Sequence, residues 1–188
     1  YQRYVKEYCR TIRSVDEQVG RLLDYLEEKG VLDNTVIVYT SDQGFLLGEH
    51  GLYDKRFMYE ESFRTPLIIS CPSLVKKHSV CKELVQNIDL APTFLSLAGV
   101  EVPKEMSGRS LLPLFKNGKA ENWRNELYYH FYDYPAVGSV RKHDGIRTKR
   151  YKLIHWHGEG SGNDEAIDFW ELYDFCLLYT SPSPRDTE

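Results

Sequence analysis

The sequence predicts an α/β fold in which helices flank a mainly parallel sheet, followed by a small antiparallel sheet. Three observations carry this prediction: a long amphipathic helix near the start, two short β-branched runs around a polar loop, and a series of aromatic runs near the end. They divide the chain into an α/β portion at residues 1–120, an antiparallel sub-domain at 121–174 and a tail at 175–188.

The first predicted element is a helix that leads into a strand. Apolar residues recur at three- and four-residue steps from Val5 to Leu26, with charged residues between them. Gly30 is expected to end this helix, because glycine adopts the left-handed conformation common just after a helix cap. The β-branched run at residues 35–40 then predicts a buried parallel strand.

A second strand and a short helix complete the α/β portion. The run at residues 66–70 predicts the strand, and it follows the first strand after a loop rich in Gly, His, Lys and Arg. Residues 89–99 predict the helix, because Asp89 and Pro92 lie near its start and Gly99 lies at its end. We expect this helix to pack on the sheet.

The character of the sequence changes from Glu126 onward. Short aromatic and β-branched runs predict the strands of an antiparallel sub-domain, at residues 127–132, 145–148, 151–155 and 170–173. Residues 175–188 then leave this pattern for a Ser-Pro-rich run that resembles translated adapter sequence. We therefore expect residues 175–188 to be a non-native tail.

Composition excludes several classes of function. Hydrophobic residues make up 41% and charged residues 28%, which is typical of a globular protein, and no run is long enough to span a membrane. The net charge of -4 and the dispersed basic residues argue against a nucleic-acid partner. The start at Tyr1 lacks an initiator Met and a signal peptide, so we expect the chain to begin within a longer protein.

The four cysteines do not have the paired spacing of a zinc site. They are expected to be buried thiols, with a Cys71–Cys81 disulfide as the alternative in an oxidising compartment. The cysteines are Cys9, Cys71, Cys81 and Cys176.

The first candidate chemical groups are Asp42 and Gln43, directly after the first predicted strand. In α/β sheets, ligand-binding groups collect where strands end and loops begin. A carboxylate and an amide carbonyl are oxygen ligands that calcium or magnesium prefers, although two ligands are too few for a complete site. A Ser-Asp turn without a metal is the alternative for this dipeptide taken alone.

Lys55 and His50 follow in the same loop. The ammonium of Lys55 suits a tetrahedral oxyanion and could neutralise charge that develops on a leaving oxygen; the alternative is a solvated surface lysine. His50 lies between two glycines, Gly48 and Gly51, and either donates to a substrate oxygen or braces the loop. Arg64 is expected to pair with Glu60 or Glu61 rather than to bind substrate.

Taken together, these segments resemble the C-terminal half of the type I sulfatases, which belong to the alkaline phosphatase superfamily. The resemblance extends from about Tyr4 to Asp174 and is closest to bacterial sulfatases of sulfated glycans, including N-acetylglucosamine-6-sulfatase-like members. The matching segments are the helix at Val15-Asp16 to Gly20, the strand end Thr40-Ser41-Asp42-Gln43-Gly44, the loop with Gly48-Glu49-His50-Gly51 and Asp54-Lys55-Arg56, the helix at Ile88 to Thr93 with Leu97-Ala98-Gly99, and Gly145-Ile146-Arg147 followed by Tyr151-Lys152-Leu153-Ile154.

The resemblance implies a calcium-dependent hydrolase of sulfate esters with an alkaline-phosphatase-like sheet. It implies that Asp42 and Gln43 are calcium ligands, that Lys55 contacts the sulfate and, less directly, that His50 contacts the substrate. Its substrates would be sulfated glycans or other sulfate esters, and its location periplasmic, secreted or lysosomal.

The chain departs from the family pattern in one respect. These enzymes use a formylglycine made from a Cys/Ser-x-Pro-x-Arg motif, and neither this motif nor the two acidic calcium ligands that precede it occur here. The chain alone is therefore expected to be an inactive fragment. Two alternatives stay open: a phosphodiester or phosphonate-ester hydrolase of the same superfamily, and a non-catalytic glycan-binding relative.

Overall fold

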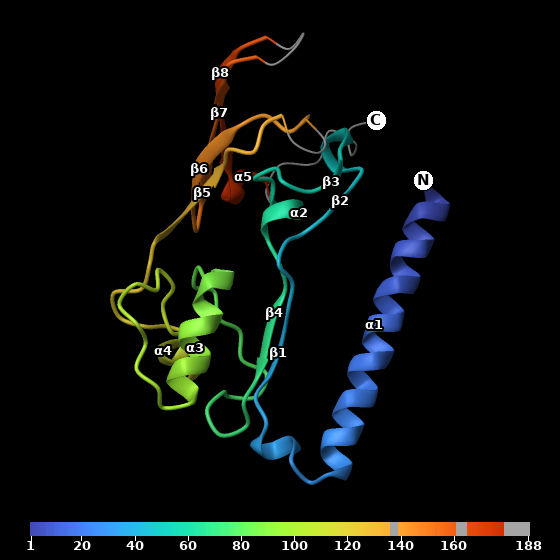
Figure 1. Ribbon diagram of the computed structural model, residues 1–188, viewed down its shortest axis with the longest axis vertical. Helices are drawn as coiled ribbons and strands as arrows, with labels where there is room; N and C mark the ends of the chain where they lie inside the picture. The colour runs from blue at the N-terminus through green and yellow to red at the C-terminus, as the bar shows by residue number, and fades with distance from the viewer. Residues whose placement is uncertain (136–138, 161–164, 179–188) are drawn as a thin grey trace.

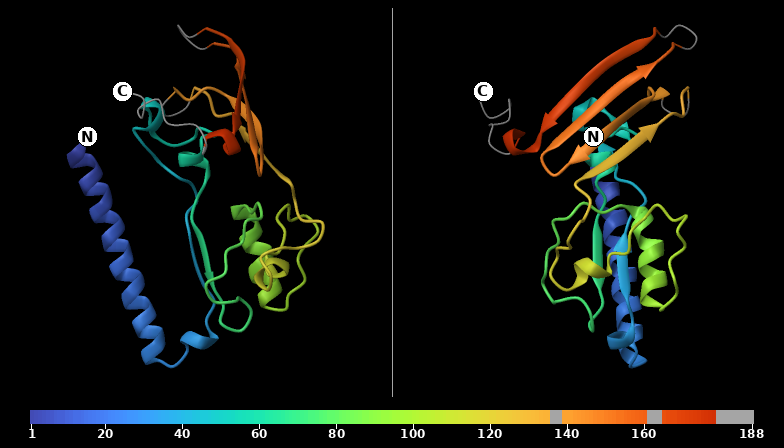
Figure 2. Two further views of the ribbon diagram at one scale, coloured as in Figure 1. Left: turned by 180° about the vertical axis from the view of Figure 1, so that it is seen from behind. Right: turned by 90° about the vertical axis from the view of Figure 1, so that its left-hand side faces the viewer.

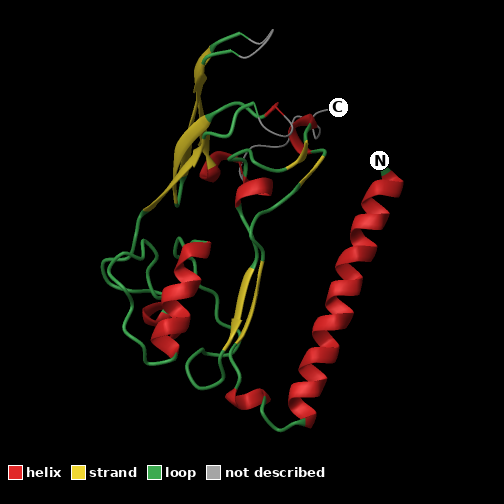
Figure 3. Cartoon of the chain, viewed as in Figure 1, coloured by secondary structure: helices red, strands yellow, loops and turns green. Residues whose placement is uncertain are grey.

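The computed structural model describes residues 1–135, 139–160 and 165–178 (Figure 1). A long helix lies beside a two-stranded ribbon, two short helices lie on the other side of that ribbon, and a four-stranded sheet lies beyond one end of it (Figures 1 and 2). Figure 3 shows how much of the connection between these parts is loop. None of the described helices has both the length and the apolar character of a membrane span.

Helix α1 (Gln2–Glu28) confirms the predicted amphipathic helix. It ends where the amide of Gly30 donates to the Glu27 carbonyl and the amide of Val31 to that of Leu26, with Gly30 at φ 67°. No residue of α1 is buried. Its first turns touch the rest of the chain through Tyr4, whose ring meets that of Tyr53 at 5.7 Å.

The predicted parallel sheet is absent from the described residues. After the short helix η1 (Leu32–Asn34), strand β1 (Ile37–Thr40) pairs with β4 (Leu67–Ser70), and the pairing is antiparallel, with Ile37 opposite Ser70. A β-branched run predicts that a strand exists but carries no information on its partner, which is chosen by contacts far along the chain. The prediction of two strands is confirmed, and their parallel arrangement is wrong for this part of the molecule.

The loop between β1 and β4 has structure of its own. It contains a small antiparallel ribbon, a short helical turn and a one-turn helix that returns to β4. These are β2 (Leu46–Leu47), η2 (Glu49–Gly51), β3 (Tyr53–Asp54) and α2 (Glu60–Phe63).

Helices α3 (Leu90–Leu97) and α4 (Leu112–Phe115) cover one side of the ribbon formed by β1 and β4. The core here is built on Leu111, Leu114 and Phe115, against which Leu67 and Ile69 of β4 pack. Leu90 and Leu97 of α3 pack against the same core, so the predicted packing of the 89–99 helix on a sheet is confirmed.

Asp89 anchors the start of α3. It lies in η3 (Asn87–Asp89), is fully buried, and receives hydrogen bonds from the Arg124 guanidinium and from the backbone amide of Arg109. A buried carboxylate needs such partners, because unpaired burial of a charge is costly.

The predicted antiparallel sub-domain is present as a four-stranded sheet in chain order. Its strands are β5 (Glu126–Phe131), β6 (His143–Thr148), β7 (Tyr151–Gly158) and β8 (Ile167–Asp174). Its inner face contributes Ile154 and Trp156 to a second core, which also contains Met58 from the loop before α2. Through this core the sheet supports the loop that carries the candidate site.

The tail and the cysteines complete the description. Residues 175–178 form the short helix α5 (Phe175–Leu178), and the rest of the predicted tail, 179–188, lies outside the described residues. Of the cysteines, Cys71 is buried as expected, whereas Cys9, Cys81 and Cys176 are exposed, so burial was wrongly predicted for three of them. No disulfide joins the described cysteines.

Candidate active-site loop

Asp42 and Gln43 lie directly after β1, as predicted. The Asp42 carboxylate accepts a hydrogen bond from the backbone amide of Gln43 at 3.0 Å, and the Ser41 hydroxyl donates to the Gln43 carbonyl at 2.9 Å. The Asp42 side chain is exposed, and Gln43 is half-buried. Among the described residues no cation pairs with Asp42, so its negative oxygens are available to a ligand.

Asn87 holds this strand end in place. Its side-chain amide donates to the carbonyl of Ser41 at 3.1 Å and to that of Asp42 at 2.9 Å. Asn87 comes from η3, more than 40 residues further along the chain. Sequence reasoning missed this residue, because no local pattern shows that an asparagine two positions before Asp89 reaches back to β1.

Gly44 allows the loop to lie against α2. Its amide donates to the Ser62 carbonyl at 2.8 Å, and the next amide, of Phe45, donates to the Glu61 carbonyl at 2.7 Å. A Cβ atom on Gly44 would lie 1.9 Å from the Glu61 carbonyl oxygen. The backbone at position 44 therefore lies too close to the backbone of α2 for any side chain, and only glycine fits there.

Gly44→Ala should lower the free energy of unfolding by about 1–3 kcal/mol, because the added methyl group forces two hydrogen-bonded backbone segments apart. Gly20→Ala is the matched control. Gly20 lies within α1 with nothing near its Cβ position, so alanine there should stabilise by about 0.5–1 kcal/mol. Denaturant unfolding measures both changes, and an unchanged stability of Gly44→Ala would show that the loop yields at little cost.

His50 braces the loop in this structure. Its Nε2 lies 3.4 Å from an Oε2 of Glu61, and its ring stacks on that of Tyr59 with centroids 4.5 Å apart. Of the two roles left open by the sequence, the loop-bracing contact is thus present. The side chain is 42% exposed, so its edge stays accessible to a substrate.

Lys55 is half-buried, and among the described residues its ammonium makes no ion pair or hydrogen bond, including to Asp42 and Gln43. Its neighbours Asp54 and Arg56 have φ of 78° and 89°, in the left-handed region that side chains rarely adopt, and they pair with each other at 2.5 Å. Backbone strain of this kind concentrates at functional loops. The lysine is held at a sharply turned point of the loop, and its charge has no ionic partner among the described residues.

A buried ionic cluster lies behind the loop. Lys152 of β7 is 1% exposed, and its ammonium donates to the Met58 carbonyl and to Glu60, both at 2.5 Å. Arg147 of β6 contacts the same carboxylate at 3.2 Å. Glu60 was expected to be one of two possible partners of Arg64, but Arg64 is exposed and forms no ion pair among the described residues. The partners of Glu60 are instead Lys152 and Arg147 of the C-terminal sheet.

Electrostatics agree with an ionised Glu60. Burial by itself raises the pKa of this carboxyl, but the hydrogen bond and charge of Lys152, with the charge of Arg147, outweigh burial and hold the pKa of Glu60 below its ordinary value. Burial lowers the pKa of Lys152. The cluster fastens α2, and with it Gly44 and His50, to the C-terminal sheet.

The fold of this chain resembles that of several solved structures. One is a protein in complex with its substrate D-glucosamine-2-N,6-O-disulfate, with 54% sequence identity and a TM-score of 0.81, covering 88% of this chain and 33% of that chain. Another is a phosphonate monoester hydrolase from Silicibacter pomeroyi, with 28% identity and a TM-score of 0.71, covering 86% of this chain and 33% of that one. The fold is that of sulfatases and related hydrolases of the alkaline phosphatase superfamily.

Residues 48–179 match the family described as N-sulphoglucosamine sulphohydrolase, C-terminal, and the chain belongs to this sulfatase family. An N-acetylglucosamine-6-O-sulfatase of Bacteroides thetaiotaomicron is 54% identical over 176 residues, which is 93% of this chain and 30% of that protein. The chain thus spans about a third of the length of these relatives.

Proposed function

We propose that this chain is part of a sulfatase that hydrolyses a sulfate ester on a glucosamine-type sugar. The observation that carries the proposal is the 54% identity, over nearly the whole chain, to an N-acetylglucosamine-6-O-sulfatase. The solved relative bound to a disulfated glucosamine supports the same substrate class. The exposed acid of Asp42, the free ammonium of Lys55 and the edge of His50 are the groups in this chain that would meet the sulfate.

Asp42 and Gln43 would hold a calcium ion. They fit it, because a carboxylate and an amide carbonyl are hard oxygen ligands, and the exposed Asp42 carboxylate has no cation beside it among the described residues. Calcium, when bound, would neutralise part of the negative charge of the sulfate. The Asn87 amide, which holds the backbone of Ser41 and Asp42, would keep these two ligands oriented.

Lys55 would contribute the second positive charge. Its ammonium would hold a sulfate oxygen and offset the charge that develops as the ester bond breaks. His50 would orient the sugar or donate to a substrate oxygen, while Glu61 and Tyr59 keep its ring in place. The nucleophile and the further acidic ligands would come from the part of the relatives that this chain does not span, so the chain alone should be inactive.

The second candidate is hydrolysis of a phosphonate monoester. It is favoured by the likeness to the Silicibacter pomeroyi enzyme and by a 37% identical relative, from Trinickia caryophylli, called a multifunctional alkaline phosphatase superfamily protein. Sulfate and phosphonate monoesters are both tetrahedral oxyanions, so the same cation and lysine would serve both.

The full-length protein that carries this chain should release sulfate from glucosamine 6-sulfate much faster than it cleaves an aryl phosphonate monoester. Removal of calcium with a chelator should abolish this activity, and Asp42→Asn should raise the calcium concentration needed to restore it. Faster cleavage of the phosphonate would favour the second candidate. Binding of the sulfated sugar without turnover of either ester would instead indicate a non-catalytic glycan-binding relative.

A further inference from the structure

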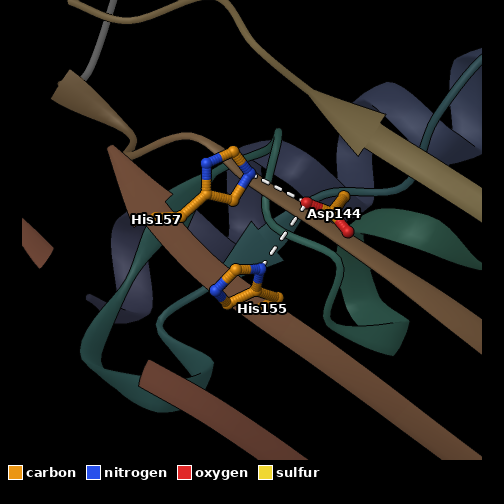
Figure 4. A group of neighbouring side chains, drawn as sticks. All are labelled: Asp144, His155 and His157. Carbon is orange, nitrogen blue, oxygen red and sulfur yellow. Dashed lines mark ion pairs between the residues drawn. The ribbon is translucent and has the colours of Figure 1, made fainter. Parts of the chain in front are cut away.

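Two histidines and an aspartate meet on the outer face of the C-terminal sheet. This is the face opposite the one that packs Ile154 and Trp156 into the second core. Asp144 comes from β6, and His155 and His157 come from β7. Antiparallel pairing sets Asp144 directly opposite His155, and the period of two along a strand puts His157 on the same face. Figure 4 shows both rings directed at the same carboxylate oxygen of Asp144.

The three ligand atoms have spacings suited to one small metal ion. His157 Nε2 lies 2.8 Å, and His155 Nδ1 lies 3.9 Å, from the same Oδ1 of Asp144, and all three atoms lie within 4.8 Å of one another. In a tetrahedral zinc site with bonds near 2.1 Å, neighbouring ligand atoms are about 3.4 Å apart. The observed separations bracket that value, so small side-chain rotations would complete the geometry.

The contact of His155 with Asp168 favours a lone pair on Nδ1, the ring nitrogen that faces Asp144. The opposite nitrogen, Nε2, lies 2.7 Å from the Asp168 carboxylate, and in a neutral imidazole this nitrogen then carries the proton. Nδ1 is therefore the acceptor nitrogen, and it faces a carboxylate. Two acceptors that face each other at 3.9 Å leave room for a cation between them, either a proton or a metal ion.

The Nε2 atom of His157 likewise has no hydrogen-bond partner among the described residues. It is buried and close to Asp144, yet the alignment is not that of a hydrogen bond. The ring of His155 is also held rigidly, because Trp170 stacks on it with centroids 4.0 Å apart and planes 5° apart. The side chains of Asp144, His155 and His157 are 29%, 23% and 30% exposed, so the cluster lies near the surface although the Nε2 atom of His157 is itself buried.

We propose that Asp144, His155 and His157 bind a divalent transition-metal ion of the zinc type, with Asp168 as the carboxylate that orients His155. Two imidazoles and one carboxylate are the ligand set of such ions, whereas calcium prefers oxygen ligands alone. The pairing of a metal-binding histidine with an outer carboxylate is a recurring feature of zinc sites. The three ligands leave the fourth position of a tetrahedral ion open to water or to another ligand.

Zinc titration of the full-length protein, followed by calorimetry in saturating calcium, tests the site. Calcium occupies oxygen-only sites, so the zinc bound under these conditions reports on the histidines. We expect one zinc ion per chain, lost in the His155→Gln/His157→Gln double variant and in Asp144→Asn. Asp168→Asn should weaken zinc binding by about 10–100-fold without changing the stoichiometry.

His78→Asn is the matched control. This exposed histidine lies outside the cluster, and asparagine tolerates its left-handed φ of 56°. Zinc binding should be unchanged in this variant. Unchanged zinc binding in both Asp144→Asn and the double histidine variant, or no zinc bound by the wild type, would overturn the proposal. Melting curves without metal check that each variant is folded.

Discussion

Glu60→Ala is expected to destabilise the protein by about 3–5 kcal/mol. The change removes the carboxylate that pairs with Lys152 and Arg147, and it leaves the buried ammonium of Lys152 with the Met58 carbonyl and the rings of Phe63 and Phe175 but no carboxylate in contact. Breaking a buried pair by deleting one partner is costly because the other charge stays desolvated. Glu60 is itself 26% exposed, so water should relieve part of this cost and the lower end of the range is expected. Denaturant unfolding of the full-length protein measures the loss.

Two comparisons separate this effect from the loss of any surface charge. Glu17→Ala removes the exposed pair with Arg13 on α1 and should cost about 0.5 kcal/mol or less. Combining Glu60→Ala with Lys152→Met should recover part of the loss, because no buried ammonium remains unpaired. A loss for Glu60→Ala as small as that for Glu17→Ala would show that the buried pair contributes little.

Acid titration reports on the same pair. The pKa of Glu60 is lower in the folded protein than its ordinary value of 4.5, so the folded state binds fewer protons than the unfolded state in that range. The stabilisation is therefore complete above about pH 4.5 and is lost as the pH falls through the lowered pKa. The stability of Glu60→Ala should decline less steeply over this range than that of the wild type.

Lys55→Ala is expected to reduce kcat for sulfate release by about 100- to 1000-fold in the full-length enzyme. This expectation rests on the proposed function. The lysine is half-buried, lies at a strained point of the loop and has no ionic partner among the described residues, so its charge is available to the sulfate. If the charge acts mainly on the transition state, kcat and kcat/KM should fall together. Steady-state kinetics with glucosamine 6-sulfate measure both.

Lys77→Ala is the control for Lys55→Ala, because Lys77 is an exposed loop lysine with no ion pair among the described residues. Its kinetics should match the wild type. A normal kcat for Lys55→Ala would assign Lys55 to the surface, and a rise in KM alone would limit its role to holding the substrate. Unchanged melting temperatures are required of both variants.

Local patterns predicted most of the secondary structure. The spacing of apolar residues predicted α1, and Gly30 marked its end at a left-handed φ of 67°. The aromatic runs predicted the four strands of the C-terminal sheet, although β7 extends to Gly158 and β8 begins at Ile167, beyond the predicted limits. These features could be predicted from the sequence because each depends on residues a few positions apart.

The parallel sheet was not predicted correctly, because strand pairing depends on a partner far along the chain. The side chains that support the candidate site were missed for the same reason. Asn87 reaches Asp42 from 45 positions away, and Lys152 reaches the Met58 carbonyl across 94 positions. Asn87 stands in no local pattern that distinguishes it from an ordinary polar surface residue, and the segment that contains Lys152 resembles the sulfatases but does not indicate which group the lysine contacts.

The linear order of residues was sufficient for the periodic elements, for the resemblance to sulfatases and for the choice of Asp42, Gln43, His50 and Lys55 as candidates. Folding in three dimensions decided which distant groups meet: Glu61 with His50, Glu60 with Lys152, and Asp144 with His155 and His157. The physical reason is that helix and strand patterns report burial of a face, whereas hydrogen bonds, ion pairs and metal sites depend on angstrom-scale distances between segments that only tertiary packing brings together.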